Sequence, residues 1–480
     1  MRRTKIIATV GPATDEPGML EKLLEAGVDL FRLNYSHQNG DRHEQRVARI
    51  REISTHLGVE TGIIADLQGP KIRLEKFNKG RIQLREGQAF SLEVSMDGKT
   101  GDENRVGVTY KQLHVDVKPG NTLLLDDGRI VLEVQGVSGT EIVCKVLVGG
   151  ELSDSKGINL LGGGLSARTL TQKDIGDLQH GVKIGADYFA VSFIRSASDV
   201  NETRRYLEEA GSIAGVISKI ERAEAVENAG EIIDASAAIM IARGDLGVEM
   251  GDAVLPAIQK NLITLARTKN RPVITATQMM QSMIDSQIPL RAEVFDVANA
   301  VLDGTDAVML SAETSIGKYP AKVVQAMARI CEETEKQALT RISDHRINQH
   351  FDRIDEAVAM ATMYTANHIG ARAIASLTET GITCRWMSRI SSSIPVFGFT
   401  RNLETMRRMR LYRGVYPIRY DITHSNPLEA NREIISILLE RGYVTEGDRV
   451  IITKGDLQGM RGGTNNMKII QVGKSLETVA

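Results

Sequence analysis

Residues 215–250 read GVISKIERAEAVENAGEIIDASAAIMIARGDLGVEM, and this stretch decides the fold. It holds two short apolar runs that each end in charge, the first at Lys219 and Glu221 and the second at Gly244 and Asp245. If both runs are neighbouring parallel strands, their charged ends meet at one edge of the sheet, because paired backbones lie about 4.8 Å apart. Glu221 and Asp245 can then share one divalent cation. The stretch therefore predicts a site that handles phosphate.

Similar β-rich runs recur along the chain, and most are followed by an amphipathic segment. They are KIIATVG (5–11), LFRLNYS (30–36), GIIADLQ (62–68), YFAVSF (188–193), GVISKIE (215–221), AIMIARGD (238–245), PVITAT (272–277) and AVMLSAE (307–313). Eight such units predict an α/β protein built on a (β/α)8 TIM barrel. Polar residues gather at the carboxyl ends of the runs, where barrels of this class place their chemistry.

The spacing of the runs predicts three domains. We expect residues 1–69 and 168–342 to form the catalytic barrel and residues 70–167 to form an inserted small β-barrel lid, because alternating runs such as RIVLEV and EIVCKVLV indicate strands. An insertion at this βα loop lies at the active face of the barrel. Glycines at both joints suit a hinge, and equally a plain linker. Residues 343–480 alternate again and predict a C-terminal α/β regulatory domain with an open sheet.

Composition excludes several classes of protein. The chain has 480 residues, 42% of them hydrophobic and 25% charged, with a formal net charge of -2. This balance predicts neither a nucleic-acid nor a membrane partner. The three cysteines are far apart and fit neither a disulfide framework nor a zinc site. No signal-peptide pattern is present and no apolar stretch reaches about 18 residues, so we expect a cytoplasmic location.

Side-chain alternation along strands brings the candidate groups together. Lys219 and Glu221 share one face of their strand, which places an ammonium group beside a metal ligand. Lys219 can there stabilise negative charge on a phosphoryl group or an enolate. Gly244 leaves its backbone N–H open to a carboxylate, and Thr277 can add a hydroxyl donor. Arg32 and Arg73 are candidate phosphate clamps, with surface ion pairing as the alternative.

A second candidate anion site lies in the C-terminal region. Thr378, Thr380 and Gly381 stand between a predicted strand and the next helix, where amides and hydroxyls can receive a phosphate. A simple helix cap with a turn explains these residues equally well.

The motifs FRLNYSH, DLQGPKIR, KGINL, SKIER, ARGDLGVE, TATQMMQSM and RAEVFDVANAVLDGTDAVMLSAET stand in this order along the chain. Through this ordered set of motifs, the whole chain closely resembles the pyruvate kinase family. The resemblance implies transfer of the phosphoryl group of phosphoenolpyruvate to ADP, followed by protonation of the enolate to pyruvate. It also implies Mg2+ or Mn2+ as cofactor, a phosphorylated effector in the C-terminal domain and a homotetramer.

The resemblance also assigns roles to residues. The divalent-metal ligands are Glu221 and Asp245, and the transition-state stabiliser is Lys219. The substrate contacts are Arg32, Lys219, Gly244, Asp245 and Thr277. The nucleotide contacts are Asn34, His37, Arg73 and Lys156 of the lid. Thr277 and Ser311 match the residues that organise the proton donor, and the loop with Thr378, Thr380 and Gly381 matches the effector phosphate loop.

One position departs from many potassium-dependent relatives. Asn34, Ser36, Asp66 and the backbone of Leu67 match the monovalent-cation site, but Lys71 stands where many relatives have glutamate. An ammonium group carries the same unit charge as K+. We therefore predict that Lys71 takes the place of K+, which puts the chain in a bacterial, potassium-independent type.

Two other functions fit parts of the pattern. A metal-dependent barrel lyase or aldolase acting on a pyruvate enolate needs the same cation and lysine, but no lid that binds ADP. A catalytically silent sensor of phosphorylated metabolites needs only the C-terminal domain. The effector itself, whether fructose 1,6-bisphosphate, a sugar monophosphate or AMP, stays open.

Overall fold

The computed structural model describes residues 1–36, 40–96, 100–341, 350–421, 426–456 and 462–474. At its centre is a closed barrel of parallel strands in the order β1-β16-β15-β14-β13-β12-β3-β2. The strands are β1 (Lys5–Thr9), β2 (Leu30–Asn34), β3 (Gly62–Asp66), β12 (Tyr188–Val191), β13 (Gly215–Ile220), β14 (Ala238–Ala242), β15 (Val273–Ala276) and β16 (Ala307–Leu310). Each predicted run supplies one of them, so the predicted TIM barrel is confirmed.

Residues that alternate along each barrel strand pack into two different cores. In β1, Ile6 and Ala8 face the surrounding helices, whereas Ile7 lies in the core inside the barrel. Fully burying an aliphatic side chain of this size contributes roughly 1.5–3 kcal/mol, so both faces hold the barrel together. The longer helices of this part are α1 (Met19–Glu25), α2 (Gly40–His56), α4 (Gln172–Lys183), α5 (Ala197–Glu209), α7 (Ala229–Ala235), α8 (Arg243–Met250), α9 (Leu255–Thr268), α10 (Arg291–Asp303) and α12 (Pro320–Thr334).

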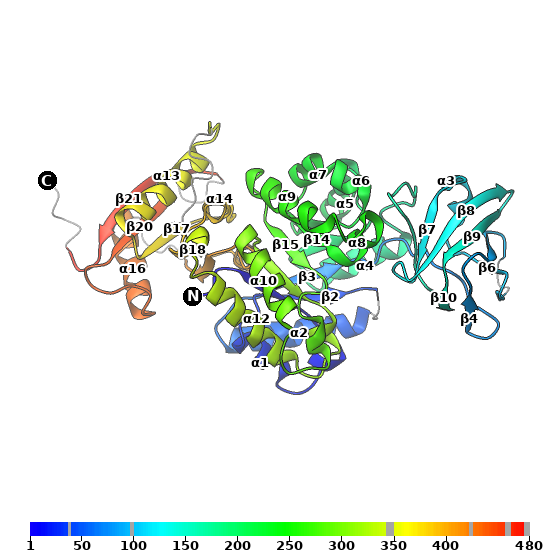
Figure 1. Ribbon diagram of the computed structural model, residues 1–480. Coiled ribbons are helices and arrows are strands. Elements are labelled where there is room, and N and C mark those ends of the chain that lie inside the picture. Colours follow the sequence, from blue (N-terminus) through cyan, green and yellow to red (C-terminus); the bar gives the residue numbers. More distant parts are fainter. Residues whose placement is uncertain (37–39, 97–99, 342–349, 422–425, 457–461, 475–480) are drawn as a thin grey trace.

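The segment between β3 and β12 forms a separate β layer beside the barrel (Figure 1). Its main sheet runs β11 (Ile158–Leu160), β7 (Thr122–Leu125), β8 (Ile130–Ser138), β9 (Glu141–Val148), β5 (Ala89–Glu93) and β6 (Arg105–Gly107), and β10 (Gly150–Ser153) pairs with β4 (Arg81–Leu84). Phe90, Leu132 and Ile142 belong to its own hydrophobic core. These strands all fall within the predicted lid. The short helix α3 (Leu113–Asp116) accompanies them.

The C-terminal part is an open sheet in the order β19-β18-β17-β20-β21, in which β21 is antiparallel to β20. Its strands are β17 (Ala373–Leu377), β18 (Val396–Thr400), β19 (Val415–Arg419), β20 (Arg449–Gly455) and β21 (Thr464–Gln471), with helices α13 (Ile354–Ile369), α14 (Ile382–Ser388), α15 (Leu403–Met409) and α16 (Pro427–Glu440). This confirms the predicted α/β class. The predicted boundary at 342/343 lies outside the described residues.

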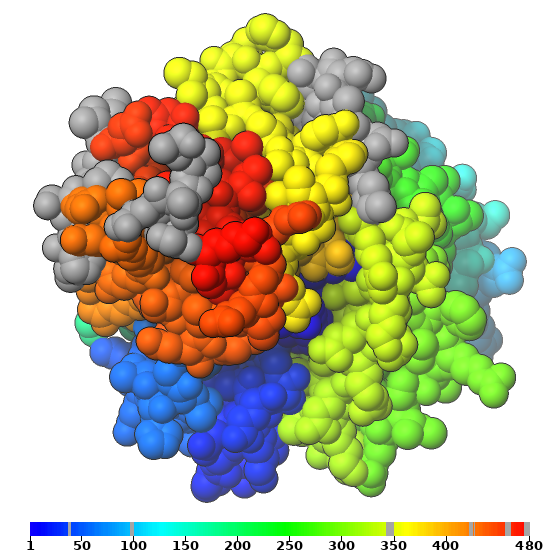
Figure 2. Space-filling view, turned by 90° about the vertical axis from the view of Figure 1, so that its left-hand side faces the viewer, coloured from blue at the N-terminus to red at the C-terminus, as the bar shows by residue number. Residues whose placement is uncertain are grey.

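The C-terminal domain packs against the amino ends of the barrel strands, opposite the lid (Figure 1). One hydrophobic cluster runs from Ile217 and Met240 inside the barrel to Trp386 and Met409 of the C-terminal domain. Seen from that side, the C-terminal domain lies above the blue amino-terminal part of the barrel (Figure 2). A predicted effector loop and a predicted active site therefore lie at opposite ends of the same barrel.

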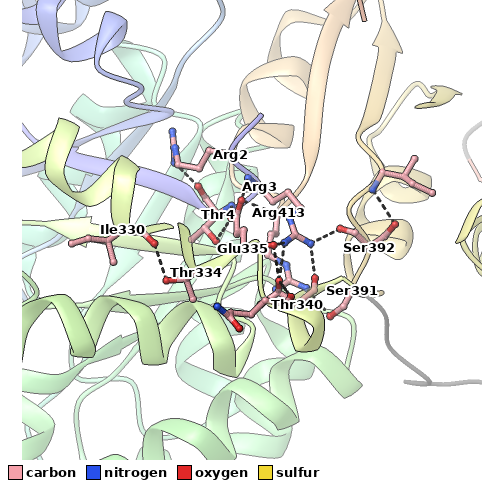
Figure 3. Close-up of polar contacts among 12 residues, drawn as sticks. Arg2, Arg3, Thr4, Ile330, Thr334, Glu335, Thr340, Ser391, Ser392 and Arg413 are labelled. Carbon is pink, nitrogen blue, oxygen red and sulfur yellow. Dashed lines mark hydrogen bonds and ion pairs between the residues drawn. The ribbon is translucent and has the colours of Figure 1, made fainter. Parts of the chain in front are cut away.

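Polar contacts of the first residues fasten the two domains together (Figure 3). The Arg3 guanidinium donates to the carbonyls of Thr340 and Ser392, at 2.5 Å each. The Glu335 carboxylate accepts from the backbone N–H of Arg3 at 2.8 Å and of Thr4 at 2.6 Å. The segment before β1 is thus a strap between the end of α12 and the C-terminal domain.

Among the described residues, no helix combines the length and the apolar character needed to cross a bilayer.

Candidate active site

Lys219 lies at the centre of the polar cluster inside the carboxyl end of the barrel. Its strand β13 continues to Ile220, and Lys219 is paired in register with Met240 of β14. The ammonium group donates to the hydroxyl of Ser192 at 2.7 Å and lies 3.0 Å from Oε2 of Glu221. Oδ1 of Asp66 is 3.7 Å away. The predicted pairing of Lys219 with Glu221 is therefore present.

The charges around Lys219 keep it protonated. Burial alone lowers the pKa of this lysine, but the carboxylates of Asp66, Glu221 and Asp245 outweigh burial and raise the pKa above its usual value. A lysine held in this state is a fixed positive charge at the barrel mouth and not a general base.

Glu221 follows the last residue of β13 and is buried. Its Oε1 accepts from the backbone N–H of Phe193 at 2.8 Å, and its buried Oε2 lies 3.0 Å from the Lys219 ammonium group in an ion pair. Burial raises the pKa of this carboxyl, Lys219 opposes the rise, and Asp245 adds to it. A nearby cation therefore stabilises the ionised form of the Glu221 carboxyl.

Asp245 is placed differently from the prediction. Strand β14 ends at Ala242, and helix α8 (Arg243–Met250) begins at once, so Asp245 lies in the first turn of a helix and not on a strand. Its side chain is exposed at the barrel mouth. The surrounding protein raises its pKa, Lys219 opposes the rise, and Asp127 of the lid adds to it. Asp127 lies in the β7–β8 turn, so the negative charge of this turn acts on the metal-ligand candidate.

The prediction that the backbone N–H of Gly244 is open is wrong. This N–H donates to Oγ1 of Thr277 at 2.8 Å, because the first amides of a helix lack partners within the helix. Thr277 has the left-handed φ of 67°, which is uncommon for a residue with a β-branched side chain. The Arg243 guanidinium holds this turn by donating to the carbonyl of Thr277 at 2.7 Å and to Asp296 at 2.6 Å. Arg243 is a positioning residue that the sequence did not indicate.

Arg32 and Lys219 both contact the carboxylate of Asp66. Its Nε donates to Oδ2 of Asp66 at 2.6 Å, and one terminal nitrogen donates to Oγ1 of Thr9 at 3.1 Å. Asp66 is thus held between two cations. The structure brings Arg32, Asp66 and Lys219 together as one charged group.

The residues predicted for a monovalent cation are only partly assembled. Oδ1 of Asn34 accepts from the backbone N–H of Ser36 at 3.0 Å, and the carbonyl of Leu67 accepts from Ser192 at 3.1 Å. Lys71 is exposed, and no ion pair with Asp66 is present among the described contacts. Partial desolvation and the charges of Arg73 and Lys173 lower the pKa of Lys71. The replacement of K+ by Lys71 therefore stays a prediction.

The predicted nucleotide contacts are spread over the barrel and the lid. Lys156 forms an ion pair with Asp126 at 2.8 Å, next to the β7–β8 turn. Arg73 lies at the start of the lid, where its backbone bridges to Gly157. Asn34 ends β2, and His37 lies outside the described residues. Ser311, the other proton-donor candidate, donates its backbone N–H to Glu313 at 2.6 Å.

The predicted effector loop forms a turn before α14. Oγ1 of Thr378 accepts from the backbone N–H of Gly381 at 2.9 Å, and Gly381 has a left-handed φ of 77°. These contacts match the alternative explanation, a helix cap with a turn. The binding of a phosphate by this loop stays a prediction.

Ser192 is one of the polar residues at the ends of the predicted runs, whereas Asp126 and Asp127 were missed as neighbours of the site. Ser192 ends its run at the same level as the other polar residues, so its position gave a signal. The sequence gave no sign that the two aspartates lie near the site, because the distance between a turn of an inserted domain and the barrel cannot be deduced from the sequence.

The residues fit a hard divalent cation. Glu221 and Asp245 supply carboxylate oxygens, and desolvation by the surrounding protein raises the pKa of both carboxyl groups, so a cation beside them is favourable. Mg2+ is typically held by one or two carboxylates together with substrate phosphates and water. Clusters of three or more His, Cys, Asp or Glu side chains suited to a metal were not found in the described part of the chain.

Comparison with known proteins gives one consistent result. Residues 1–324 match the family described as pyruvate kinase, barrel domain, and residues 356–470 match pyruvate kinase, alpha/beta domain. The chain is 52% identical to a pyruvate kinase of Buchnera aphidicola over 98% of this chain and 99% of the relative. It is 50% identical to pyruvate kinase II of Salmonella typhimurium, again over 98% and 99%. A solved pyruvate kinase from Cryptosporidium parvum superposes with a TM-score of 0.91 at 32% identity, covering 98% of this chain and 96% of that one.

Proposed function

Because the chain belongs to the pyruvate kinase family, we propose that it transfers the phosphoryl group of phosphoenolpyruvate to ADP in a Mg2+- or Mn2+-dependent reaction that yields ATP and pyruvate, the last step of glycolysis. The observation that carries the proposal is the charged Lys219 held beside Glu221 and Asp66 at the barrel mouth. The lyase, aldolase and sensor functions gain no support, since the relatives described above are all named pyruvate kinases.

In this reaction the protein supplies charge and position. Lys219 and Arg32 stabilise the negative charge that develops on the phosphoryl group and the enolate. When bound at Glu221 and Asp245, the divalent cation neutralises substrate oxygens as a Lewis acid. Thr277, fixed by Arg243, binds the substrate carboxylate with its hydroxyl, and Thr277 and Ser311 hold the proton donor near the enolate. The lid excludes water, which would otherwise take the phosphoryl group.

Metal binding can be measured without turnover. In Glu221→Gln, one anionic ligand becomes neutral, so we expect the affinity for Mn2+ to fall at least about tenfold. Paramagnetic resonance of free Mn2+ during titration gives the affinity directly. Glu44→Gln is the matched control, because Glu44 forms an exposed ion pair with Lys183. This change should leave the Mn2+ affinity unchanged. Equal Mn2+ affinity in Glu221→Gln and wild type would remove Glu221 from the metal site.

For the nucleotide we propose contacts from Asn34, His37, Arg73 and Lys156. Lys156 lies on the lid and its exposed fraction is 34%, so its ammonium group is accessible to a phosphate although Asp126 holds it here. In Lys156→Gln we expect the KM for ADP to rise more than the KM for phosphoenolpyruvate.

We further propose that K+ is dispensable. Asp66 already has Arg32 and Lys219 as cationic partners, and Lys71 lies on the loop that follows it. Activity in buffer free of K+ and Na+ should therefore be close to activity at saturating K+. Lys71→Glu should create a K+ requirement that the wild type lacks. Strong activation of the wild type by K+ would contradict the proposal.

The homotetramer is also a proposal, and two exposed apolar faces support it. Ile288, Leu290 and Phe295 are 73%, 61% and 69% exposed around α10, and Ile354 and Tyr364 are 70% and 52% exposed on α13. A tetramer with two kinds of two-fold interface needs two such self-complementary faces. Light scattering should give four times the chain mass, and Phe295→Asp should give a smaller species. A monomeric wild type would contradict the proposal.

We place the protein in the cytoplasm, as expected for a glycolytic enzyme, and propose that a phosphorylated effector binds the loop with Thr378, Thr380 and Gly381.

A further inference from the structure

A cavity of about 750 Å³ lies between the amino ends of the barrel strands and the C-terminal domain. Tyr188, Gly215 and Ala237 line it from the barrel, and residues of α14 and α15 line it from the other side. The space is large enough for a small organic ligand. It is at the end of the barrel opposite to Lys219, so it is separate from the active site.

Two arginines point to the charge of the ligand. Arg385 and Arg408 both line the cavity, and the Nε of each is buried without a hydrogen-bond partner in the described part of the chain. Neither side chain forms an ion pair there, although one terminal nitrogen of Arg408 donates to the carbonyl of Ile213 at 3.2 Å. Leaving a buried donor unpaired costs free energy. Guanidinium groups bind phosphate oxygens with matching geometry, so these two cavity-lining arginines, which have no carboxylate partner in the described part of the chain, suit an anionic phosphate.

The acidic residues at the cavity do not remove this preference. Glu379 lies 3.5 Å from Arg401 and accepts from Nδ2 of Asn402 at 2.9 Å, so its charge is already engaged. Glu404 is exposed at the first turn of α15. Three arginines against two carboxylates leave the lining net positive, and Arg385 and Arg408 are the two arginines without an ion pair among the described residues.

Other walls of the cavity suit an apolar group. Tyr412, Ile213 and Ala237 line it, and the hydroxyl of Tyr188 is occupied because it donates to the carbonyl of Arg408 at 2.9 Å. That bond also fixes the backbone of Arg408 against the barrel. A ring or chain attached to the phosphate can pack on this apolar wall.

We propose that this cavity binds an organic phosphate, with Arg385 and Arg408 holding the phosphate and Tyr412 contacting the organic part. Thr380 of the predicted effector loop lines the cavity, whereas Thr378 and Gly381 are not among its walls. The cavity shares Thr380 with the predicted effector loop, and its arginines and its barrel wall set it apart from a phosphate site on the turn of Thr378. Because its walls belong to two domains, the ligand stabilises the domain arrangement in which the cavity has this shape.

The chain carries its own reporter for this site. Trp386 is the only tryptophan of the sequence, and the Arg385 guanidinium lies 5.7 Å from the centre of its ring. Phenyl phosphate is a suitable probe, since it combines a phosphate with a ring. Titrating it into the full-length protein should change the Trp386 fluorescence in a saturable way, and phenol should not.

Variants distinguish binding in this cavity from binding at the turn of Thr378. Arg408→Gln should weaken phenyl phosphate binding at least about tenfold, as expected for loss of a charged hydrogen bond. Arg419→Gln, at an exposed ion pair on the edge strand β19, should leave binding unchanged. Circular dichroism and kinase activity verify that each variant is folded, and Arg385→Gln, read out by calorimetry, repeats the test. A wild type without a saturable signal, or binding lost in Thr378→Ala but retained in Arg408→Gln, would overturn the proposal.

Discussion

Lys219→Met is expected to lower kcat for pyruvate formation by about 10²–10³-fold, the usual effect of removing one donor that stabilises transition-state charge. The ammonium group lies between Ser192, Glu221 and Asp66, where no other described lysine contacts these groups. Methionine preserves most of the side-chain volume and removes only the charge. Steady-state kinetics at saturating phosphoenolpyruvate, ADP and Mg2+ measure the effect.

The fold should tolerate the Lys219 change. Asp66 keeps Arg32 as its partner, and Glu221 keeps the backbone N–H of Phe193. Lys183→Met, at an exposed ion pair with Glu44, is the control and should have normal turnover. If Lys219→Met and Lys183→Met both matched wild type in kcat, the role assigned to Lys219 would be wrong.

Asp306→Ala is expected to lower the free energy of unfolding by about 3–5 kcal/mol, the usual cost of removing one partner of a buried ion pair. Asp306 precedes β16, and the Arg389 guanidinium, which follows α14, donates to both of its oxygens. Both side chains are only 1% exposed. Asp306 also accepts from the backbone N–H of Val273 at 3.0 Å and of Arg413 at 3.1 Å. Its loss leaves Arg389 charged and buried at the domain junction.

Thermal denaturation followed by circular dichroism measures this effect as a lower midpoint. The double variant Asp306→Ala/Arg389→Met should recover part of the loss, because no charge then remains unpaired. Asp421→Ala, at the exposed pair with Arg419, should change stability by less than about 0.5 kcal/mol. A melting temperature of Asp306→Ala equal to that of wild type would contradict the structural role of this pair.

The barrel could be predicted from the sequence because its strands are buried on both faces. Such strands read as continuous apolar runs, and GVISKI and AIMIA are examples. Strand β19 is difficult to recognise from the sequence for the opposite reason. It contains Pro417, which argues against a strand, and it is tolerated because β19 pairs only with β18 at the edge of the sheet.

The candidate site was predictable where strand alternation fixes direction. Lys219 and Glu221 lie two residues apart and do meet. Gly244 and Asp245 were placed less well, because the change from strand to helix at Arg243 redirects the backbone N–H and the carboxylate. Tertiary packing brings Arg243 to the carbonyl of Thr277, and it places the charge of Asp127 where it affects Asp245. Local sequence patterns do not encode such packing.

The most direct test of the central claim is to supply the purified protein with phosphoenolpyruvate, ADP and Mg2+ and to measure pyruvate and ATP together. The two products should appear in equal amounts, and both should be lost when ADP or the divalent cation is omitted. Pyruvate formation without ATP, or no pyruvate at all, would contradict the assignment of this barrel to phosphoryl transfer.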